Sequence, residues 1–447
     1  MIRRLLARLL PGKQARTPRI YPPNQHAVRG AQLSNPARTV IRRLQEEGFK
    51  AYVVGGAVRD LLLGIVPKDF DIATDATPEQ VKPLFRRAFI IGRRFRLVHV
   101  HVGNEALEVS TFRAAQTGVD ATDEHGRLLS DNVYGSQAED AARRDFTINA
   151  LYFDPESETI LDYVGGVPDI RARRLRLIGP PVTRFREDPV RMLRAVRLAA
   201  KLGLAIDRKT EEPIQRLAPL MQNVPPARLF EEMQKLLLSG HAVGTLKSLR
   251  AHGLSHGLLP LLDVILEQPL GLKFIDAALV VTDERVRTDK GVSPAFLFAA
   301  LLWHEVLGTW NAAKERGERP LPALFDAMDH VLSAQAERIA IPRRFEATIK
   351  EIWSLQPRFE QRAGSRPMRL LDHPRFRAAY DFLALRGQSG EVALELVDWW
   401  TRFQTATDDE RQAMLKPDEA PKKRRRPRSR RKRAEPAGEA APPSAEE

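Results

Sequence analysis

The sequence contains no cysteine and no long uninterrupted apolar segment. The absence of cysteine excludes a disulfide scaffold, thiol catalysis and cysteine-ligated zinc, and it is consistent with a reducing cytoplasm. No apolar run approaches the roughly 20 residues that a membrane-spanning helix needs. What is present is a chain of 447 residues with 43% hydrophobic residues, which is long enough for two to four domains with cores of their own.

Acidic residues are missing from the first 20 residues, which carry six arginines or lysines. Residues 417–447 add ten basic against six acidic residues, so much of the net charge of +14 lies at the two ends. Basic ends favour polyanions such as nucleic acid, and solvated, solubilising tails are the alternative. The opening "MIRRLLARLLPGK" is too interrupted by arginine for a signal peptide. We expect a basic arm in a cytoplasmic protein, with peripheral membrane association through this arm as an alternative.

Strand and helix patterns alternate in the first part of the chain and become helical later. "NPARTVIRRLQEEGF" reads as a helix capped by Asn35, "KAYVVGG" as a buried strand, "AVRDLLLG" as a short helix ended by Gly64 and "KDFDIAT" as a second strand. "FRLVHVHVGNEALEVSTFR" predicts a hairpin, and the polar residues 114–136 predict a loop. From residue 185 onward the helical period dominates. We therefore expect an α/β head of about 150 residues and a long α-helical body.

Two carboxylates, Asp69 and Asp71, stand one residue apart in the second predicted strand. Side chains at i and i+2 of a strand point to the same face, so the two repel each other unless a cation lies between them. Mg²⁺ prefers oxygen ligands and keeps waters and substrate phosphates as its other partners. The preceding glycine turn lets a phosphate approach the backbone, and Arg59 is placed to hold a terminal phosphate. The pattern predicts a metal–triphosphate site that supports in-line displacement with two ions.

A third carboxylate is expected to complete the metal site, and the residues leave two candidates. Glu108 lies on a strand that can pair beside the strand of the two aspartates, and we favour it on geometry. Asp145 is the other candidate, although Asp145 and Asn149 suit the ribose of an incoming nucleotide better.

These motifs, in this order, resemble the class II nucleotidyltransferase superfamily of bacterial poly(A) polymerases and CCA-adding enzymes. The matching segments are "VVGGAVRDLLLG", "KDFDIAT", "EVSTFR", "RRDFTINAL", "DYVGG" and "REDPVRMLRAVRLAAKLG". The resemblance implies an α/β nucleotidyltransferase head with a small mixed β-sheet and helices, followed by an elongated all-α body and a disordered basic C-terminal tail. It also implies that Asp69 and Asp71 bind the catalytic metals and that Gly56 and Arg59 contact the nucleotide triphosphate.

The segment "EDPVR" is interpreted as the reader of the base. We expect Glu187, Asp188 and Arg191 to open a helix, where an Asp188–Arg191 pair can accept from and donate to the edge of a base. The resemblance implies this role, in which protein side chains replace a template strand. The expected nucleotide-binding residues are Gly55, Gly56, Arg59, Arg113, Arg144, Asn149, Asp188, Arg191, Arg194 and Arg197.

The segments "GRRFRLVHV" and "PPARLFEEMQKLL" and the basic tail are more similar to the polymerase branch than to the CCA-adding branch. The resemblance therefore implies template-independent addition of AMP from ATP to RNA 3′ ends, with two Mg²⁺ ions, or Mn²⁺, as cofactors. A CCA-adding enzyme that uses CTP and ATP is the first alternative, and a non-catalytic RNA-binding adaptor is the second.

The expected organisation has five parts. They are a basic arm (1–32), a catalytic head (33–180), a nucleotide-recognition neck (181–240), an RNA-binding helical body (241–416) and a disordered tail (417–447). We expect a monomer that meets RNA 3′ ends and RNA-decay proteins. The predicted RNA-binding residues of the tail are Lys422, Lys423, Arg424, Arg425, Arg426, Arg428, Arg430, Arg431, Lys432 and Arg433.

Overall fold

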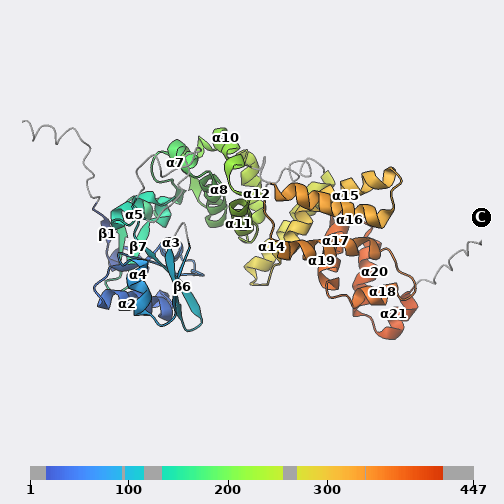
Figure 1. Ribbon diagram of the computed structural model, residues 1–447, viewed down its shortest axis with the longest axis horizontal. Coiled ribbons are helices and arrows are strands. Elements are labelled where there is room, and N and C mark those ends of the chain that lie inside the picture. Colours follow the sequence, from blue (N-terminus) through green and yellow to red (C-terminus); the bar gives the residue numbers. More distant parts are fainter. Residues whose placement is uncertain (1–16, 93–95, 115–132, 255–268, 338, 416–447) are drawn as a thin grey trace, which may run out of the picture.

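The computed structural model describes residues 17–92, 96–114, 133–254, 269–337 and 339–415. The predicted loop at 115–132 and the ten basic residues of the tail lie outside the described residues. Figure 1 shows an elongated molecule with the sheet-containing head at one end and helices along the rest of its length. Among the described helices, none combines the length and apolar character needed to cross a membrane.

The head is built on one eight-stranded sheet, and this confirms the predicted α/β head with a mixed sheet. Only β3 and β6 pair in parallel; every other neighbouring pair is antiparallel. β5 and β6 form the predicted hairpin around Gly103 and Asn104. In spatial order the strands are β1 (Arg19–Tyr21), β8 (Thr159–Asp162), β7 (Leu151–Asp154), β2 (Ala51–Val54), β3 (Asp71–Thr74), β6 (Glu105–Thr111), β5 (Leu97–Val102) and β4 (Ala88–Ile91).

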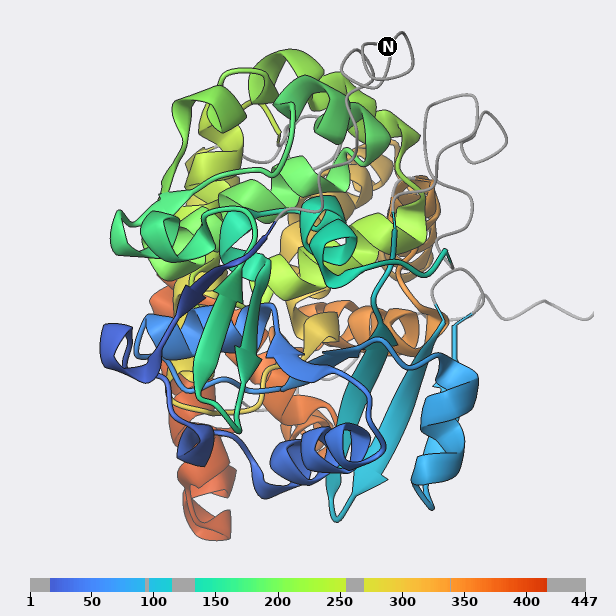
Figure 2. The ribbon, with the colours of Figure 1, turned by 90° about the vertical axis from the view of Figure 1, so that its left-hand side faces the viewer.

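Helix α2 (Asn35–Glu46) packs against β2, β3 and β6 through an apolar stripe that buries Val40, Ile41 and Leu44. Its cap differs from the prediction. Ser34, not Asn35, accepts the backbone N–H of Ala37, because the chain already turns into the helix at residue 35. Figure 2 views the head end-on, with the sheet in front and the green neck helices above it.

Part of the segment predicted as a basic arm (1–32) belongs to the sheet, because Arg19–Tyr21 form the edge strand β1. Tyr21 and Val28 are fully buried, so this stretch is part of the core of the head. The strand predicted in "KAYVVGG" and the short helix that follows it are confirmed, and the strand predicted in "KDFDIAT" is confirmed from Asp71 onward. The remaining head helices are α3 (Gly56–Leu62), α4 (Pro78–Val81), α5 (Gln137–Arg143) and α6 (Gly166–Arg171), with 3₁₀ turns at Pro23–Gln25, Gly30–Gln32, Lys82–Leu84 and Thr147–Asn149.

The described residues of the neck and body are helical, as predicted, apart from the two-residue strand β10 (Ala205–Ile206), which pairs in parallel with β9 (Arg174–Leu175) of the head. The neck holds α7 (Pro181–Glu187), α8 (Val190–Leu202), α9 (Arg208–Glu211), α10 (Ile214–Leu217) and α11 (Pro226–Leu237). The body holds α12 (Ala242–Ala251), α14 (Pro269–Arg287), α15 (Pro294–Glu315), α16 (Pro320–Ala336), α17 (Arg343–Leu355), α18 (Arg366–Leu371), α19 (Phe376–Ser389), α20 (Leu394–Thr405) and α21 (Asp408–Met414).

A buried apolar cluster continues without a break from Tyr21 in the head, through α8 and α11 of the neck, to Phe382 in α19. A separate cluster around Trp400 joins the end of α17 to α19 and α20. Because the head, neck and near part of the body share one core, residues on these three parts are held in fixed relative positions.

Candidate active site

Asp69 and Asp71 lie beside the carboxyl end of β2, where the chain leaves that strand and enters the glycine turn. Val54, the last residue of β2, pairs with Asp71 in the antiparallel register. Strand β3 therefore begins at Asp71 rather than at Lys68, because the residues before Asp71 have no partner on β2 once that strand turns away at Gly55. Buried Phe70 separates the two exposed aspartates, as expected for an alternating segment with one face in the core.

Glu108 is the register partner of Asp71 in the parallel pair of β3 and β6. Register partners present their side chains to the same face of a sheet, so both carboxylates face the same side. Burial by surrounding protein, followed by the negative charge of Glu108, raises the pKa of Asp71 to about 6 against the opposing positive charge of Arg144, although its side chain reaches solvent. Asp69 adds further negative charge, so Arg144 offsets the charge of the carboxylates only in part.

The glycine turn brings two arginines close to the backbone beside these carboxylates. Gly55 has a φ of +76°, a conformation that side-chain-bearing residues rarely adopt. A Cβ added at Gly55 would lie 3.5 Å from Arg144 Nη1, and one at Gly56 would lie 3.4 Å from Arg59 Nη2. The turn thus combines close access to the backbone with two guanidinium groups, which suits a phosphate chain.

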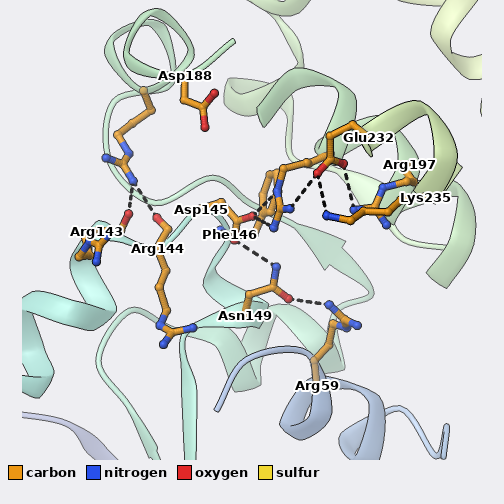
Figure 3. A network of polar contacts seen from close by, with 12 residues as sticks. Arg59, Arg143, Arg144, Asp145, Phe146, Asn149, Asp188, Arg197, Glu232 and Lys235 are labelled. Carbon is orange, nitrogen blue, oxygen red and sulfur yellow. Dashed lines mark hydrogen bonds and ion pairs between the residues drawn. The ribbon is translucent and has the colours of Figure 1, made fainter. Parts of the chain in front are cut away.

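A polar network joins the glycine turn to the neck (Figure 3). Arg59 donates from Nη1 to Asn149 Oδ1 at 2.7 Å, and Asn149 Nδ2 donates to Asp145 Oδ1 at 3.1 Å. Arg194 of α8 contacts Asp145 Oδ2 through Nε at 2.9 Å and Nη2 at 2.6 Å. Glu232 of α11 completes the network, with one oxygen 3.4 Å from Arg194 Nη1.

Asp145 and Glu108 differ in their surroundings, since Asp145 is paired with a protein cation and Glu108 is exposed. Burial would raise the pKa of Asp145, but Arg194, Asn149 and the backbone N–H of Phe146 together lower this pKa to about 2. Both of its oxygens are already engaged in hydrogen bonds. Glu108 is exposed beside Asp71, and its contact is His99 Nε2 at 3.5 Å. The geometry places Glu108, and not Asp145, with the aspartate pair.

The "EDPVR" segment does not form the single helix start that the sequence predicts. Glu187 is the last residue of α7, Asp188 follows it, and α8 begins at Val190. Asp188 Oδ2 accepts from Arg228 of α11 at 3.0 Å, whereas Arg191 contacts Glu187 at 3.1 Å. Each of the two side chains therefore has its own partner of opposite charge in the protein, and their joint contact with a base stays a prediction.

Asp188 retains one unused acceptor. Its Oδ1 is buried and has no hydrogen-bond partner within the described part of the chain. A buried carboxylate oxygen left unpaired costs about 1–3 kcal/mol or more, so such an atom favours a ligand that donates to it. The exocyclic amino group of a base is a donor of this kind.

The remaining predicted arginines are held by other protein groups. Arg144 pairs with Asp140 at 3.0 Å and lies over the ring of Tyr152. Arg113 is buried and donates to the backbone oxygen of Arg96 at 3.0 Å. Arg197 contacts Glu232 at 3.4 Å.

Sequence reasoning missed Arg228 and Glu232, although one signal was available. Glu232 stands within the buried apolar stripe of α11, between Leu229 and Phe230 on one side and Met233 and Leu236 on the other. A charged residue on an otherwise apolar helix face requires a buried partner. Arg228 carried no comparable signal, because its partner lies 40 residues away.

The residues present fit a divalent cation that retains other ligands. Across the described ranges, no three His, Cys, Asp or Glu side chains form a preformed metal cluster. Mg²⁺ does not require one, since it is commonly held by one or two carboxylates together with water and substrate phosphates. The aspartate pair, with a raised pKa for Asp71, supplies ligands of this kind.

In metal-free buffer, Asp71→Asn is expected to raise the melting temperature at about pH 8 and to leave it unchanged near pH 4. The pKa of Asp71 lies near 6 in the folded protein against an ordinary value of 3.8, so ionisation of this carboxyl opposes folding above pH 6 and has no effect below 3.8. The measurement is thermal denaturation in EDTA at both pH values. Added Mg²⁺ should then stabilise the wild type more than the variant, and an equal response of both proteins would contradict the metal assignment.

Three family models match the chain. They are described as "Poly A polymerase head domain" over residues 51–176, "Probable RNA and SrmB- binding site of polymerase A" over 203–266 and "Polymerase A arginine-rich C-terminus" over 316–434. Together they extend from the sheet of the head into the C-terminal tail.

Among curated proteins, poly(A) polymerase I of Escherichia coli O6:H1 is 47% identical over 93% of this chain and 92% of its own length. The CCA-adding enzyme of Geobacillus thermodenitrificans is 43% identical, but over only 48% of this chain and 52% of its own length. Among solved structures, the Thermotoga maritima CCA-adding enzyme complexed with tRNA shares the fold, with a TM-score of 0.55, 18% identity and 83% of each chain covered.

Proposed function

The chain belongs to the bacterial poly(A) polymerase family, and from this membership we infer that it extends RNA 3′ ends with adenylate, without a template. It is a polynucleotide adenylyltransferase that takes AMP from ATP and releases pyrophosphate. The observation that carries this conclusion is the extent of similarity. The match to a poly(A) polymerase runs through head, neck and body, whereas the match to a CCA-adding enzyme covers about half of this chain.

The proposed metal ligands are Asp69 and Asp71, with Glu108 as the third carboxylate. Two Mg²⁺ ions, or Mn²⁺, would lower the pKa of the 3′-hydroxyl and spread the charge that develops on the α-phosphate. The register of β3 with both β2 and β6 supports this assignment, since it gathers the aspartates and Glu108 beside the glycine turn. Asp145 is assigned to positioning instead, because its charge is already neutralised by Arg194.

The proposed nucleotide site lies across the glycine turn. Gly55 and Gly56 would admit the triphosphate to the backbone, with Arg59, Arg144 and Arg113 supplying positive charge. Asn149 would hold Arg59 in place and face the ribose. These roles fit the distances of the network, in which each group is fixed by a partner of the protein before any ligand binds.

The proposed base-reading groups are Asp188 and Arg191. The unpartnered Oδ1 of Asp188 would accept from the amino group of adenine, while Arg228 fixes the other oxygen. Arg194 and Arg197 would act from the next turns of α8 by holding Asp145 and Glu232.

We keep the five-part division of the chain as a proposal, with residues 17–32 now part of the head. The proposed RNA-binding parts are the helical body and the basic tail, where each neutralised phosphate releases a counterion and gives sequence-independent affinity. A monomeric state, a cytoplasmic location, contacts with RNA-decay proteins and a membrane-surface role of the first residues stay predictions from the sequence.

Incubation of the purified protein with an unstructured RNA, Mg²⁺ and one nucleotide at a time tests the function. Long extension with ATP alone is expected, with little incorporation of the other nucleotides. An RNA that ends in a 3′-deoxynucleotide is the matched control and should not be extended, because it lacks the attacking hydroxyl. Addition limited to CTP and ATP over three steps would identify a CCA-adding enzyme instead, and no incorporation of any nucleotide would favour the adaptor.

A further inference from the structure

A cavity of about 670 Å³ lies where the head meets the neck and the body. Its walls come from the loop before β3, from α8 and α11, and from the end of α14. Five of the side chains that line it are basic, and one, Glu231, is acidic. The basic residues of this cavity, here called the junction pocket, are Lys68, Arg197, Lys201, Lys235 and Arg287.

The positive charge of the junction pocket is only partly neutralised by the protein. Arg197 and Lys235 share the single carboxylate of Glu232, at 3.4 Å and 3.5 Å (Figure 3). Within the described part of the chain, Lys68 and Lys201 form no ion pair. The Nε of Arg197 is buried and has no hydrogen-bond partner among those residues.

The nearby cations of the junction pocket disfavour the charged form of Lys201. Burial, together with the positive charges of Arg59, Arg197 and Lys68, lowers the pKa of Lys201, against the opposing effect of Asp60. Gathered like charges with an unused donor are costly unless an anion binds among them. The pocket therefore has the properties of an anion site rather than of a solvated surface.

The position of Lys68 connects this anion site to the reaction. Lys68 immediately precedes Asp69, so the loop that supplies one wall of the junction pocket continues in the chain into the aspartate pair. We propose that the junction pocket binds the backbone phosphates of the RNA just upstream of its 3′ end, and so delivers the terminal hydroxyl to the aspartates. This inference rests on the proposed function.

The same chemistry could in principle serve the triphosphate of ATP or the released pyrophosphate, and the position of the pocket favours RNA. The groups assigned to the triphosphate are the glycine turn, Arg59, Arg113 and Arg144, and none of them lines the junction pocket, although the charge of Arg59 reaches Lys201. In an in-line displacement the attacking and leaving oxygens lie on opposite sides of the phosphorus. An anion site on the neck and α14 side of the aspartates therefore suits the attacking strand.

The test compares the full-length wild type with the variants Lys201→Gln, Arg287→Gln and the double variant. The double variant should bind a short oligoadenylate about tenfold more weakly, with a salt slope reduced by about 1.4, because each lost phosphate contact removes about 0.7 for a single strand. The KM for ATP and inhibition by pyrophosphate should stay near the wild-type values. Lys273→Gln, an exposed lysine on α14 away from the pocket, is the matched control and should bind as the wild type does.

Oligoadenylates with one neutral methylphosphonate linkage locate the contact. A neutral linkage near the 3′ end should weaken binding by the wild type and cause no further loss in the double variant, whereas a linkage near the 5′ end should weaken both equally. A raised KM for ATP or weaker pyrophosphate inhibition with unchanged RNA binding would assign the pocket to the other phosphate source. If the double variant binds RNA, ATP and pyrophosphate as the wild type does, and the wild type adds AMP, this inference alone is overturned. A wild type that adds no AMP would overturn the proposed function.

Discussion

Asp71→Asn and Asp69→Asn are each expected to reduce kcat for AMP transfer by about a thousandfold or more, equivalent to about 4 kcal/mol of transition-state stabilisation. An amide matches the carboxylate in size but lacks the full negative charge that holds a divalent cation. Both side chains are exposed, Asp71 as the first residue of β3 and Asp69 just before that strand, so the fold should tolerate the change. The measurement is single-turnover incorporation of labelled AMP at saturating ATP and RNA.

Asp75→Asn provides the matched control for this loss. Asp75 lies just after β3, is exposed and accepts the backbone N–H of Lys50 at 2.8 Å, a bond that an amide oxygen can also accept. This variant should turn over at nearly the wild-type rate. Substantial turnover by either Asp69→Asn or Asp71→Asn would remove the metal assignment, and equal losses in all three variants would indicate a general effect of charge.

Arg194→Gln is expected to lower the free energy of unfolding by about 2–3 kcal/mol and to raise the KM for ATP by about tenfold. The change leaves Asp145 and Glu232 without their shared cation, and both carboxylates are largely buried. We place the energetic cost below that of a fully buried pair because a third of the Arg194 side chain is exposed. Asn149 and Arg59 then lose the anchor that fixes them beside the glycine turn. Urea denaturation and steady-state kinetics measure the two effects.

The double variant Asp145→Asn with Arg194→Gln separates loss of the pair from loss of a single charge. It should be destabilised by less than the sum of the two single variants, because each single variant leaves the other member of the pair uncompensated and the double variant removes both. Arg216→Gln, an exposed arginine of α10, is the surface control and should change stability by at most about 0.5 kcal/mol. Strict additivity of the two substitutions would show that Asp145 and Arg194 do not depend on each other.

The part of the sheet that carries the proposed metal ligands could be predicted from the sequence because its elements are local. A strand that ends in two glycines and an alternating strand with two aspartates each carry their own period, and antiparallel pairing of the two places Asp71 beside the turn. Glu108 followed from the alternation of its own strand, where Leu107 and Val109 are buried on either side of it. The edge strand β1 could not be predicted from the sequence, because its three residues show no distinctive alternation of polar and apolar side chains.

The ion pairs of the neck could not be predicted because they join residues far apart in the sequence. Asp145 meets Arg194 across 49 residues, and Asp188 meets Arg228 across 40 residues. Local spacing placed Asp188 and Arg191 three residues apart, but it did not indicate which protein group would hold each side chain. Helical periodicity tells which side chains share a face, but it does not tell which carboxylate on another element that face will meet.

The unused oxygen of Asp188 has a consequence for the composition of the product. On the proposed assignment, the next nucleotide is selected by protein side chains that keep their position while the RNA moves through the site. Selection in one cycle does not depend on the nucleotide that was added in the cycle before. A product made of one repeated nucleotide then follows from a selecting site that does not change between cycles.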